Sequence, residues 1–255
     1  MLNLILKDGS VLEVEEGCYA YEAAKKLSEG LARNALAAKL DGEIVEMNAK
    51  IEKEGKIEFL TFDDEDGRKV YRHTASHVLA QAVKRLYPEV KLAIGPAIDD
   101  GFYYDFDSDV TFSPEMLEKL EGEMKKIIKE NLPVERKVMP RDEAVKYMTE
   151  KGEEYKVELI NDLPEGEEVS FYTQGEFTDL CAGPHLTSTG KLKAVKLTSC
   201  TGAYWRGDST KKMLKRVYGT AFPKQSELDG VSFGYSGGKC DYQHGKEQFL
   251  RAPDA

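Results

Sequence analysis

Two of the four histidines in this 255-residue sequence lie four residues apart, in a segment with the apolar spacing of a helix. Residues at that separation share one helix face, so the imidazoles of His73 and His77 are expected to point the same way. Cys181 and His185 have the same separation around Gly183-Pro184, which cannot continue a helix. We therefore predict these two side chains at a strand end and in the turn after it. Imidazoles and a thiol are donor types of tetrahedral metal sites and of hydrolytic centres.

A purely structural role is the alternative for these residues, because an exposed helix can carry two histidines by chance and a single cysteine is often a small core residue. The chain has only four histidines and four cysteines, and the two pairs together favour a site. No glutamate follows His73, so the helix is not the HExxH helix of a zinc protease. If all four residues bound zinc, the site would be closed, as structural sites usually are. The sequence leaves open whether zinc is bound.

Several elements are needed to position these residues. An apolar stripe is expected to hold the histidine helix in a core, and its members are Val78, Leu79, Ala82, Val83 and Leu86. Ser113-Pro114 is the N-terminal signal of a second helix, which runs to about residue 130. A hairpin is predicted over 90–106, strands at 132–138, 169–173, 177–180, 194–199 and 212–218, a helix at 141–150, and a loop at 202–207.

Residues 1–62 form a smaller unit with its own pattern. Two strands flank an Asp-Gly turn at residues 8–9, and a short amphipathic helix and three further strands follow. This order predicts a ubiquitin-like β-grasp, in which we find no catalytic constellation. The acidic run at 63–67 is predicted to be a linker, so the second unit begins at residue 68.

Composition describes a globular protein with room for two domains: 41% of the residues are hydrophobic and 32% are charged. No apolar run is long enough to span a membrane, and the N-terminus lacks a signal-peptide core. The expectation is a cytoplasmic protein without a membrane partner. The cysteines are scattered without CxxC spacing, which argues for reduced thiols.

The formal net charge of −10 is unevenly distributed. Residues 1–66 hold 16 Asp and Glu against 8 Lys and Arg, whereas residues 190–216 hold eight Lys and Arg against Asp208 alone. A basic tract of this kind is compatible with a phosphate backbone, although most charge runs are solvated surface. The candidate contacts to a nucleic-acid backbone in this tract are Lys191, Lys193, Lys196, Arg206, Lys211 and Lys212.

Four motifs occur in one order along the chain: HxxxH at 73–77, Gly-Pro at 95–96 with Gly-Phe-Tyr-Tyr-Asp at 101–105, Thr-Asp-Leu-Cys-Ala-Gly-Pro-His at 178–185, and Gly-Ala-Tyr-Trp-Arg-Gly at 202–207. With them, the chain closely resembles the bacterial threonyl-tRNA synthetases from residue 1 to about residue 228. The β-grasp unit resembles a TGS domain. The resemblance implies an α+β protein, with a TGS domain at 1–62 and a two-part editing domain of the threonyl/alanyl-tRNA synthetase type at 68–224.

The resemblance implies hydrolysis of Ser-tRNA(Thr), the product of mischarging, at the acceptor end of the tRNA. His73, His77, Cys181 and His185 match the editing residues of the family, and the same four are the candidate zinc ligands. Tyr104, Lys156 and Asp179 lie in matching motifs and are predicted to bind substrate. We expect His73 to position or deprotonate a water or to bind the ribose hydroxyl, Asp179 to hold the α-ammonium, and Lys156 to steady a phosphate or the oxyanion. Cys181 is the weaker candidate as a nucleophile, because an activating base would have to come from His73 or His185 in a non-helical geometry.

The chain also departs from the family. The class II aminoacylation domain and the anticodon-binding domain have no counterpart, so we expect no ATP site, no threonylation by this chain alone, and a monomer. The match fades after residue 228, and 225–255 is predicted to be a divergent, disordered tail. The rival interpretations are an inactive fragment or tRNA-acceptor-binding module, and a zinc-binding regulator. A stringent-response hydrolase is disfavoured because no histidine is followed by Asp.

Overall fold

The structure is a computed structural model that describes residues 1–110 and 112–231. Most of the predicted tail at 225–255 therefore lies outside the described residues. Its first residues form a short helix, α7 (Gln225–Asp229), with Leu228 buried. Within the described part of the chain, no helix is both long and apolar enough to cross a bilayer.

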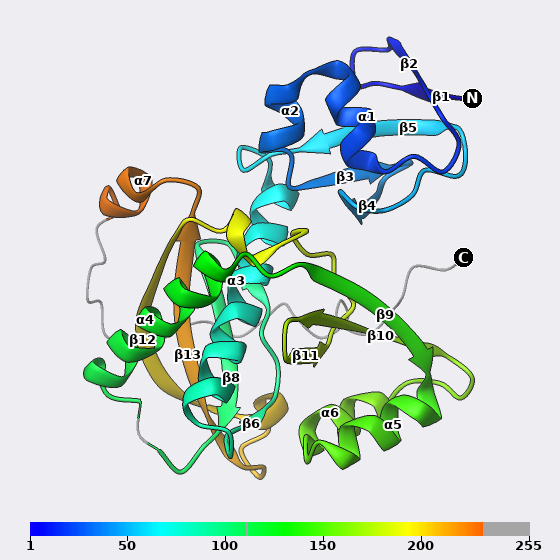
Figure 1. The fold of residues 1–255 in the computed structure, drawn as a ribbon. Coiled ribbons are helices and arrows are strands. Elements are labelled where there is room, and N and C mark those ends of the chain that lie inside the picture. The colour runs from blue at the N-terminus through cyan, green and yellow to red at the C-terminus, as the bar shows by residue number, and fades with distance from the viewer. Residues whose placement is uncertain (111, 232–255) are drawn as a thin grey trace.

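The N-terminal domain is a five-stranded sheet in the order β2-β1-β5-β3-β4, with two helices packed on it (Figure 1). Its strands are β1 (Leu2–Ile5), β2 (Val11–Val14), β3 (Ala37–Leu40), β4 (Glu43–Glu46) and β5 (Gly55–Leu60), and its helices are α1 (Ala20–Leu27) and α2 (Glu29–Asn34). β1 and β5 are parallel and the other pairs are antiparallel, as in a β-grasp. Sequence reasoning missed α2, which buries no residue and so has no apolar stripe to reveal it.

The long helix α3 (Glu65–Leu86) carries the HxxxH pair and begins earlier than predicted. The prediction of a linker at 63–67 is partly wrong, because Glu65, Asp66 and Gly67 already belong to the helix. Acidic residues in a first turn are favoured by the helix dipole. A side chain at Gly67 would lie 1.9 Å from the carbonyl oxygen of Thr61, so the helix packs directly against the end of β5.

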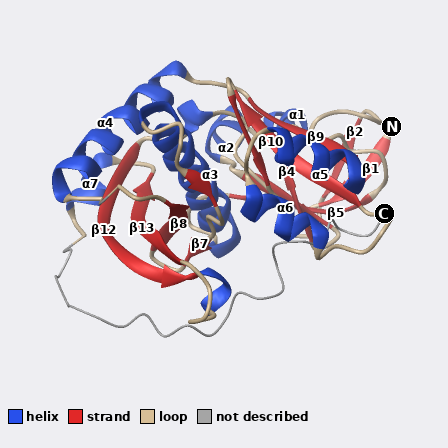
Figure 2. Ribbon diagram, turned by 90° about the horizontal axis from the view of Figure 1, so that it is seen from below, coloured by secondary structure: helices blue, strands red, loops and turns tan. Residues whose placement is uncertain are grey.

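A second sheet, in the order β12-β13-β8-β6, forms the body of the following unit, and β7 also pairs with β8. Its strands are β6 (Lys91–Leu92), β7 (Ala97–Ile98), β8 (Gly101–Asp107), β12 (Ala194–Tyr204) and β13 (Met213–Phe222). Helices α3 and α4 (Pro114–Glu130) lie on the same side of this curved sheet (Figure 2). The loop predicted at 202–207 is partly wrong: pairing with β13 extends β12 to Tyr204, and only η2 (Trp205–Gly207) turns.

A third, smaller sheet in the order β11-β10-β9 lies beside α3 and has its own helices. It consists of β9 (Val134–Pro140), β10 (Glu168–Gln174) and β11 (Phe177–Leu180), with α5 (Arg141–Glu150) and α6 (Glu154–Asn161); a 3₁₀ turn, η1 (Thr189–Lys191), follows. Helices make up 36% and strands 33% of the structure, and the expectation of an α+β fold is confirmed.

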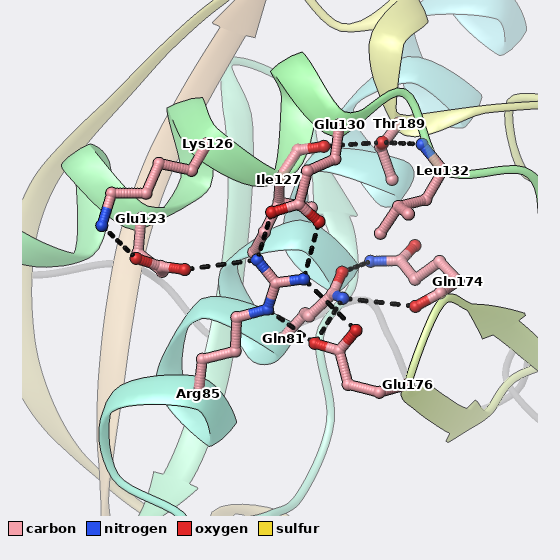
Figure 3. A network of polar contacts seen from close by, with 10 residues as sticks. All are labelled: Gln81, Arg85, Glu123, Lys126, Ile127, Glu130, Leu132, Gln174, Glu176 and Thr189. Carbon is pink, nitrogen blue, oxygen red and sulfur yellow. Dashed lines mark hydrogen bonds and ion pairs between the residues drawn. The ribbon is translucent and has the colours of Figure 1, made fainter.

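A polar network ties the β10–β11 hairpin to α3 and α4 (Figure 3). The Arg85 guanidinium donates to Glu176 at 2.6 Å, to Glu130 at 2.7 Å and to Glu123 at 3.3 Å. Beside it, the side-chain amide of Gln174 donates to Gln81 at 2.8 Å. Because β11 runs from this hairpin to Cys181, the network fixes where one half of the candidate site lies relative to the other.

This network makes stability depend on pH. Arg85 lowers the pKa of Glu176 to about 2, against about 4.3 for an unfolded chain. A carboxylate with a depressed pKa stabilises the folded state above its unfolded pKa, and this contribution is lost as the pH falls from about 4.3 to about 2. We expect the urea midpoint of an Arg85→Met variant to fall less steeply than that of the wild type between pH 5 and pH 2.5. Lys69→Met, which removes an exposed pair with Glu65, should behave like the wild type; parallel wild-type and Arg85→Met curves would contradict the prediction.

Candidate hydrolytic and metal-binding site

The four residues of the two spaced pairs converge. One donor atom from each of His73, His77, Cys181 and His185 lies within 4.8 Å of the others. The Cys181 Sγ is 3.3 Å from the Nε2 atoms of both His73 and His185. As predicted, the first two come from one face of α3 and the second two follow the end of β11.

Backbone geometry holds the 181–185 turn in place. The Gly183 N–H donates to the Cys181 Sγ at 3.2 Å, and Gly183 has a φ of 75°. A Cβ at this position would lie 1.9 Å from the Tyr172 hydroxyl. Glycine is therefore required both by the left-handed backbone and by the neighbouring ring.

The Thr74 hydroxyl connects His185 to α3. It donates to the Val70 carbonyl at 3.1 Å, accepts from the Leu186 N–H at 2.9 Å, and lies 3.2 Å from the His185 Nδ1. With the hydroxyl proton on the Val70 carbonyl, the contact with His185 is made by an Nδ1–H donor. The Nε2 lone pair then faces Cys181, and this is the usual arrangement of a metal-binding histidine.

Burial keeps these side chains uncharged. It lowers the pKa of His73 to about 3 and of His77 to about 4, and it lowers the pKa of His185 well below the ordinary value. Burial also raises the pKa of the Cys181 thiol to about 12. The structure places the imidazoles of His73 and His185, the two possible bases that the sequence offered, next to Cys181. The raised pKa of the thiol nevertheless opposes a nucleophilic thiolate in the absence of a bound cation.

A second polar cluster joins three elements. The Asp179 carboxylate at the end of β11 lies 2.7 Å from the Lys156 Nζ of α6 and accepts from the Tyr104 hydroxyl of β8 at 2.5 Å. Burial favours a raised pKa for Asp179, but Lys156 and its other partners hold it below the ordinary value. The His77 Nε2 lies 3.8 Å from Asp179 and so connects this cluster to the first.

Both clusters line one small cavity of about 30 Å³, which has room for one or two water molecules. Its lining residues are His73, His77, Ile94, Gly95, Lys156, Leu159, Asp179, Leu180 and Cys181. Of the seven predicted catalytic and substrate-binding residues, five line the cavity. The other two, His185 and Tyr104, contact the lining residues Cys181 and Asp179.

Gly95 is a cavity residue that sequence reasoning did not select. A Cβ there would lie 2.1 Å from the Tyr104 ring, and the Gly95 carbonyl accepts from Ser76 at 2.6 Å. We expect Gly95→Ala to displace the Tyr104 ring and to destabilise the protein by about 1–3 kcal/mol, as overpacked cores do. Gly122→Ala, where a Cβ meets nothing within 4 Å, is the matched control for urea unfolding. Equal behaviour of the two variants would contradict the prediction.

The basic tract does not form an unpaired cationic surface. Four of its six candidate residues make ion pairs with carboxylates from other elements: Lys196 with Glu121, Arg206 with Glu158 and Asp162, Lys211 with Glu158, and Lys212 with Asp107. Counting charges along the sequence did not reveal these partners, because they come from other elements. Among the described residues, Lys191 and Lys193 have no carboxylate partner within ion-pair distance.

Two further residues of the site were missed. Thr74 is adjacent to His73 in sequence, and this was the only feature of the sequence that could have indicated its place in the site. Tyr172 packs its ring 4.5 Å from the ring of His185, yet in sequence it reads as an ordinary aromatic core residue of a strand.

Comparisons with known proteins match the N-terminal unit and part of the second unit. Residues 3–61 match the TGS domain model, and residues 169–218 match the model of the threonyl and alanyl tRNA synthetase second additional domain. The chain is 65% identical over 229 residues to a threonine–tRNA ligase of Clostridium botulinum and 63% identical to that of Clostridium tetani. Each alignment covers 90% of this chain but only 36% of the relative. The chain therefore contains a TGS domain and the second additional domain of these synthetases, and it is homologous to about a third of a threonyl-tRNA synthetase.

Proposed function

We propose that this chain is an editing hydrolase that cleaves the ester of Ser-tRNA(Thr). The observation that carries the proposal is the shared cavity, in which neutral imidazoles face a buried lysine–aspartate pair across a space of about 30 Å³. Its support from the comparisons is the second additional domain and the similarity to threonine–tRNA ligases.

A second site that separates serine from threonine is needed on physical grounds. Serine lacks only the methyl group of threonine, and one methyl supports only about 1–3 kcal/mol of discrimination. A synthetic site therefore admits some serine. A second site that accepts the seryl ester but excludes the additional methyl of the correct product can remove this error.

In the proposed reaction, a water attacks the ester carbonyl between serine and the terminal ribose. His73, the partly exposed member of the cluster, orients this water with its imidazole, which is neutral near pH 7, for attack and loss of a proton. That proton passes to the departing ribose oxygen, so the products are serine and a free terminal hydroxyl. Asp179 holds the α-ammonium, and Lys156 stabilises the oxyanion or the terminal phosphate. Tyr104 fixes the Asp179 carboxylate through its hydroxyl.

The cluster also fits a zinc ion. Zn–N distances of about 2.0–2.1 Å and a Zn–S distance of about 2.3 Å place tetrahedral donors about 3.3–3.7 Å apart. The Cys181 Sγ lies 3.3 Å from each of two imidazole nitrogens, and Thr74 leaves the His185 lone pair facing inward. His73, His77, Cys181 and His185 would hold the ion. When bound, it would supply a fixed positive charge and hold α3 against the 181–185 turn.

We propose the acceptor end of tRNA(Thr) as the partner, with Lys191 and Lys193 as its backbone contacts. We further propose that the chain acts as a monomer in the cytoplasm.

The test compares deacylation of Ser-tRNA(Thr) and Thr-tRNA(Thr) by the wild type and His73→Ala. Selective release of serine, reduced about 100-fold or more by the substitution, is the expected result. Lys69→Ala, one turn away on an exposed part of α3, serves as the control. If neither ester is cleaved above background but the tRNA still binds, the chain is an acceptor-binding module and not a hydrolase.

A further inference from the structure

The N-terminal domain has a core of its own, and the core of the second unit extends onto it. Leu36, Ala37 and Leu60 of the N-terminal domain belong to the same buried cluster as Val70 and Tyr71 of α3. An ion pair of 2.7 Å between Lys39 and Asp66 crosses the same boundary. The N-terminal domain is therefore held in a defined position against the unit that carries the site.

One contact between the domains reaches the site itself. Glu46 ends β4, the edge strand of the N-terminal sheet, and its carboxylate accepts a hydrogen bond from the Tyr172 hydroxyl of β10. Tyr172 is 3% exposed. Burial and the neighbouring Glu46 raise the pKa of Tyr172, so its hydroxyl remains a donor at all physiological pH values.

The other side of Tyr172 lies against the turn that carries two of the four donors. Its ring is 4.5 Å from the ring of His185, and it packs in one cluster with Val134 and Cys181. The absence of a side chain at Gly183 makes room for the hydroxyl. A single side chain thus bridges a carboxylate of one domain and the 181–185 turn of the other.

We propose that Glu46 and Tyr172 are positioning residues, through which the N-terminal domain sets the position of Cys181 and His185. The hydrolytic consequence rests on the proposed function, but the position of the turn does not. Without the Glu46 acceptor, the Tyr172 ring is free to turn away from His185. His185 and Cys181 then lose the packing contact that keeps the His185 Nε2 and the Cys181 Sγ 3.3 Å apart.

The decisive variant is Glu46→Ala, because Glu46 is not a member of the histidine–cysteine cluster. The full chain has four histidines, so the imidazole signals of His185 can be followed by ¹⁵N NMR. We expect Glu46→Ala and Tyr172→Phe to shift the His185 signals in the same direction, with the double variant adding little. Glu46→Gln, which keeps an acceptor oxygen, should restore most of the wild-type spectrum. Lys39→Met breaks the Lys39–Asp66 ion pair between the domains and should leave the His185 signals unchanged.

Two further measurements test whether the position of the 181–185 turn affects metal binding and hydrolysis. Co²⁺ alone, added to each variant, should bind about 10-fold more weakly to Glu46→Ala than to the wild type, which is typical of a lost outer contact. For deacylation, kcat should fall while KM for the tRNA is retained. If Glu46→Ala leaves the His185 signals unchanged, or if Lys39→Met moves them equally, the proposal is overturned. A wild type that cleaves no ester refutes the proposed hydrolase but leaves the NMR comparison able to decide this proposal.

Discussion

Replacing Lys156 with methionine is expected to destabilise the protein by about 3–5 kcal/mol at pH 7, because it leaves a buried carboxylate without its countercharge. Lys156 and Asp179 are 3% and 2% exposed and lie 2.7 Å apart. In the variant, the Tyr104 hydroxyl would be the main remaining partner of Asp179. Urea unfolding at pH 7 measures the loss.

Two comparisons separate this explanation from a general loss of packing. A double variant, Lys156→Met with Asp179→Leu, removes both charges and should recover much of the lost stability. Lys146→Met, at an exposed position on α5, should stay within about 0.5 kcal/mol of the wild type. An unpaired buried carboxylate has a raised pKa, so the deficit of Lys156→Met should narrow as the pH falls towards 4. A double variant less stable than both Lys156→Met and Asp179→Leu alone would refute the ion-pair explanation.

Replacing Cys181 with alanine is expected to weaken Co²⁺ or Zn²⁺ binding by more than about 100-fold, because it removes the only thiol among the four clustered donors. The wild type should bind one ion per chain and show the thiolate-to-cobalt absorption band. Titration of Co²⁺ with the absorption band as readout measures both. Cys200→Ala, at a half-buried thiol on β12, should leave the band and the affinity unchanged.

The same titration should show a defined dependence on pH. The pKa of the Cys181 thiol is raised to about 12, so metal binding near neutrality must release its proton. The imidazoles of His73 and His77, with pKa values of about 3 and 4, release none. Apparent affinity should therefore rise about tenfold per pH unit between pH 6 and 8. An affinity independent of pH, or a Cys181→Ala variant that binds as tightly as the wild type, would show that the thiol is not a ligand.

Local spacing in the sequence was enough to predict much of the candidate site. The separation of four residues placed His73 and His77 on one helix face, and Gly183-Pro184 placed Cys181 and His185 in a turn after a strand. These features depend only on helix geometry and on the backbone limits of glycine and proline, which act over a few residues. The TGS domain was predicted from the order of its strands and helix, and the editing-type domain from four motifs of this local kind.

Tertiary structure alone decided which of these residues have partners, and which partners they have. The basic tract looked like a cationic surface until packing brought Glu121, Glu158 and Asp107 against it. Likewise, nothing local relates Glu46 to Tyr172, which lie 126 residues apart in sequence but form one hydrogen bond. Such contacts depend on how the edge of one sheet packs against the middle strand of another, and no period or spacing within either segment encodes that arrangement.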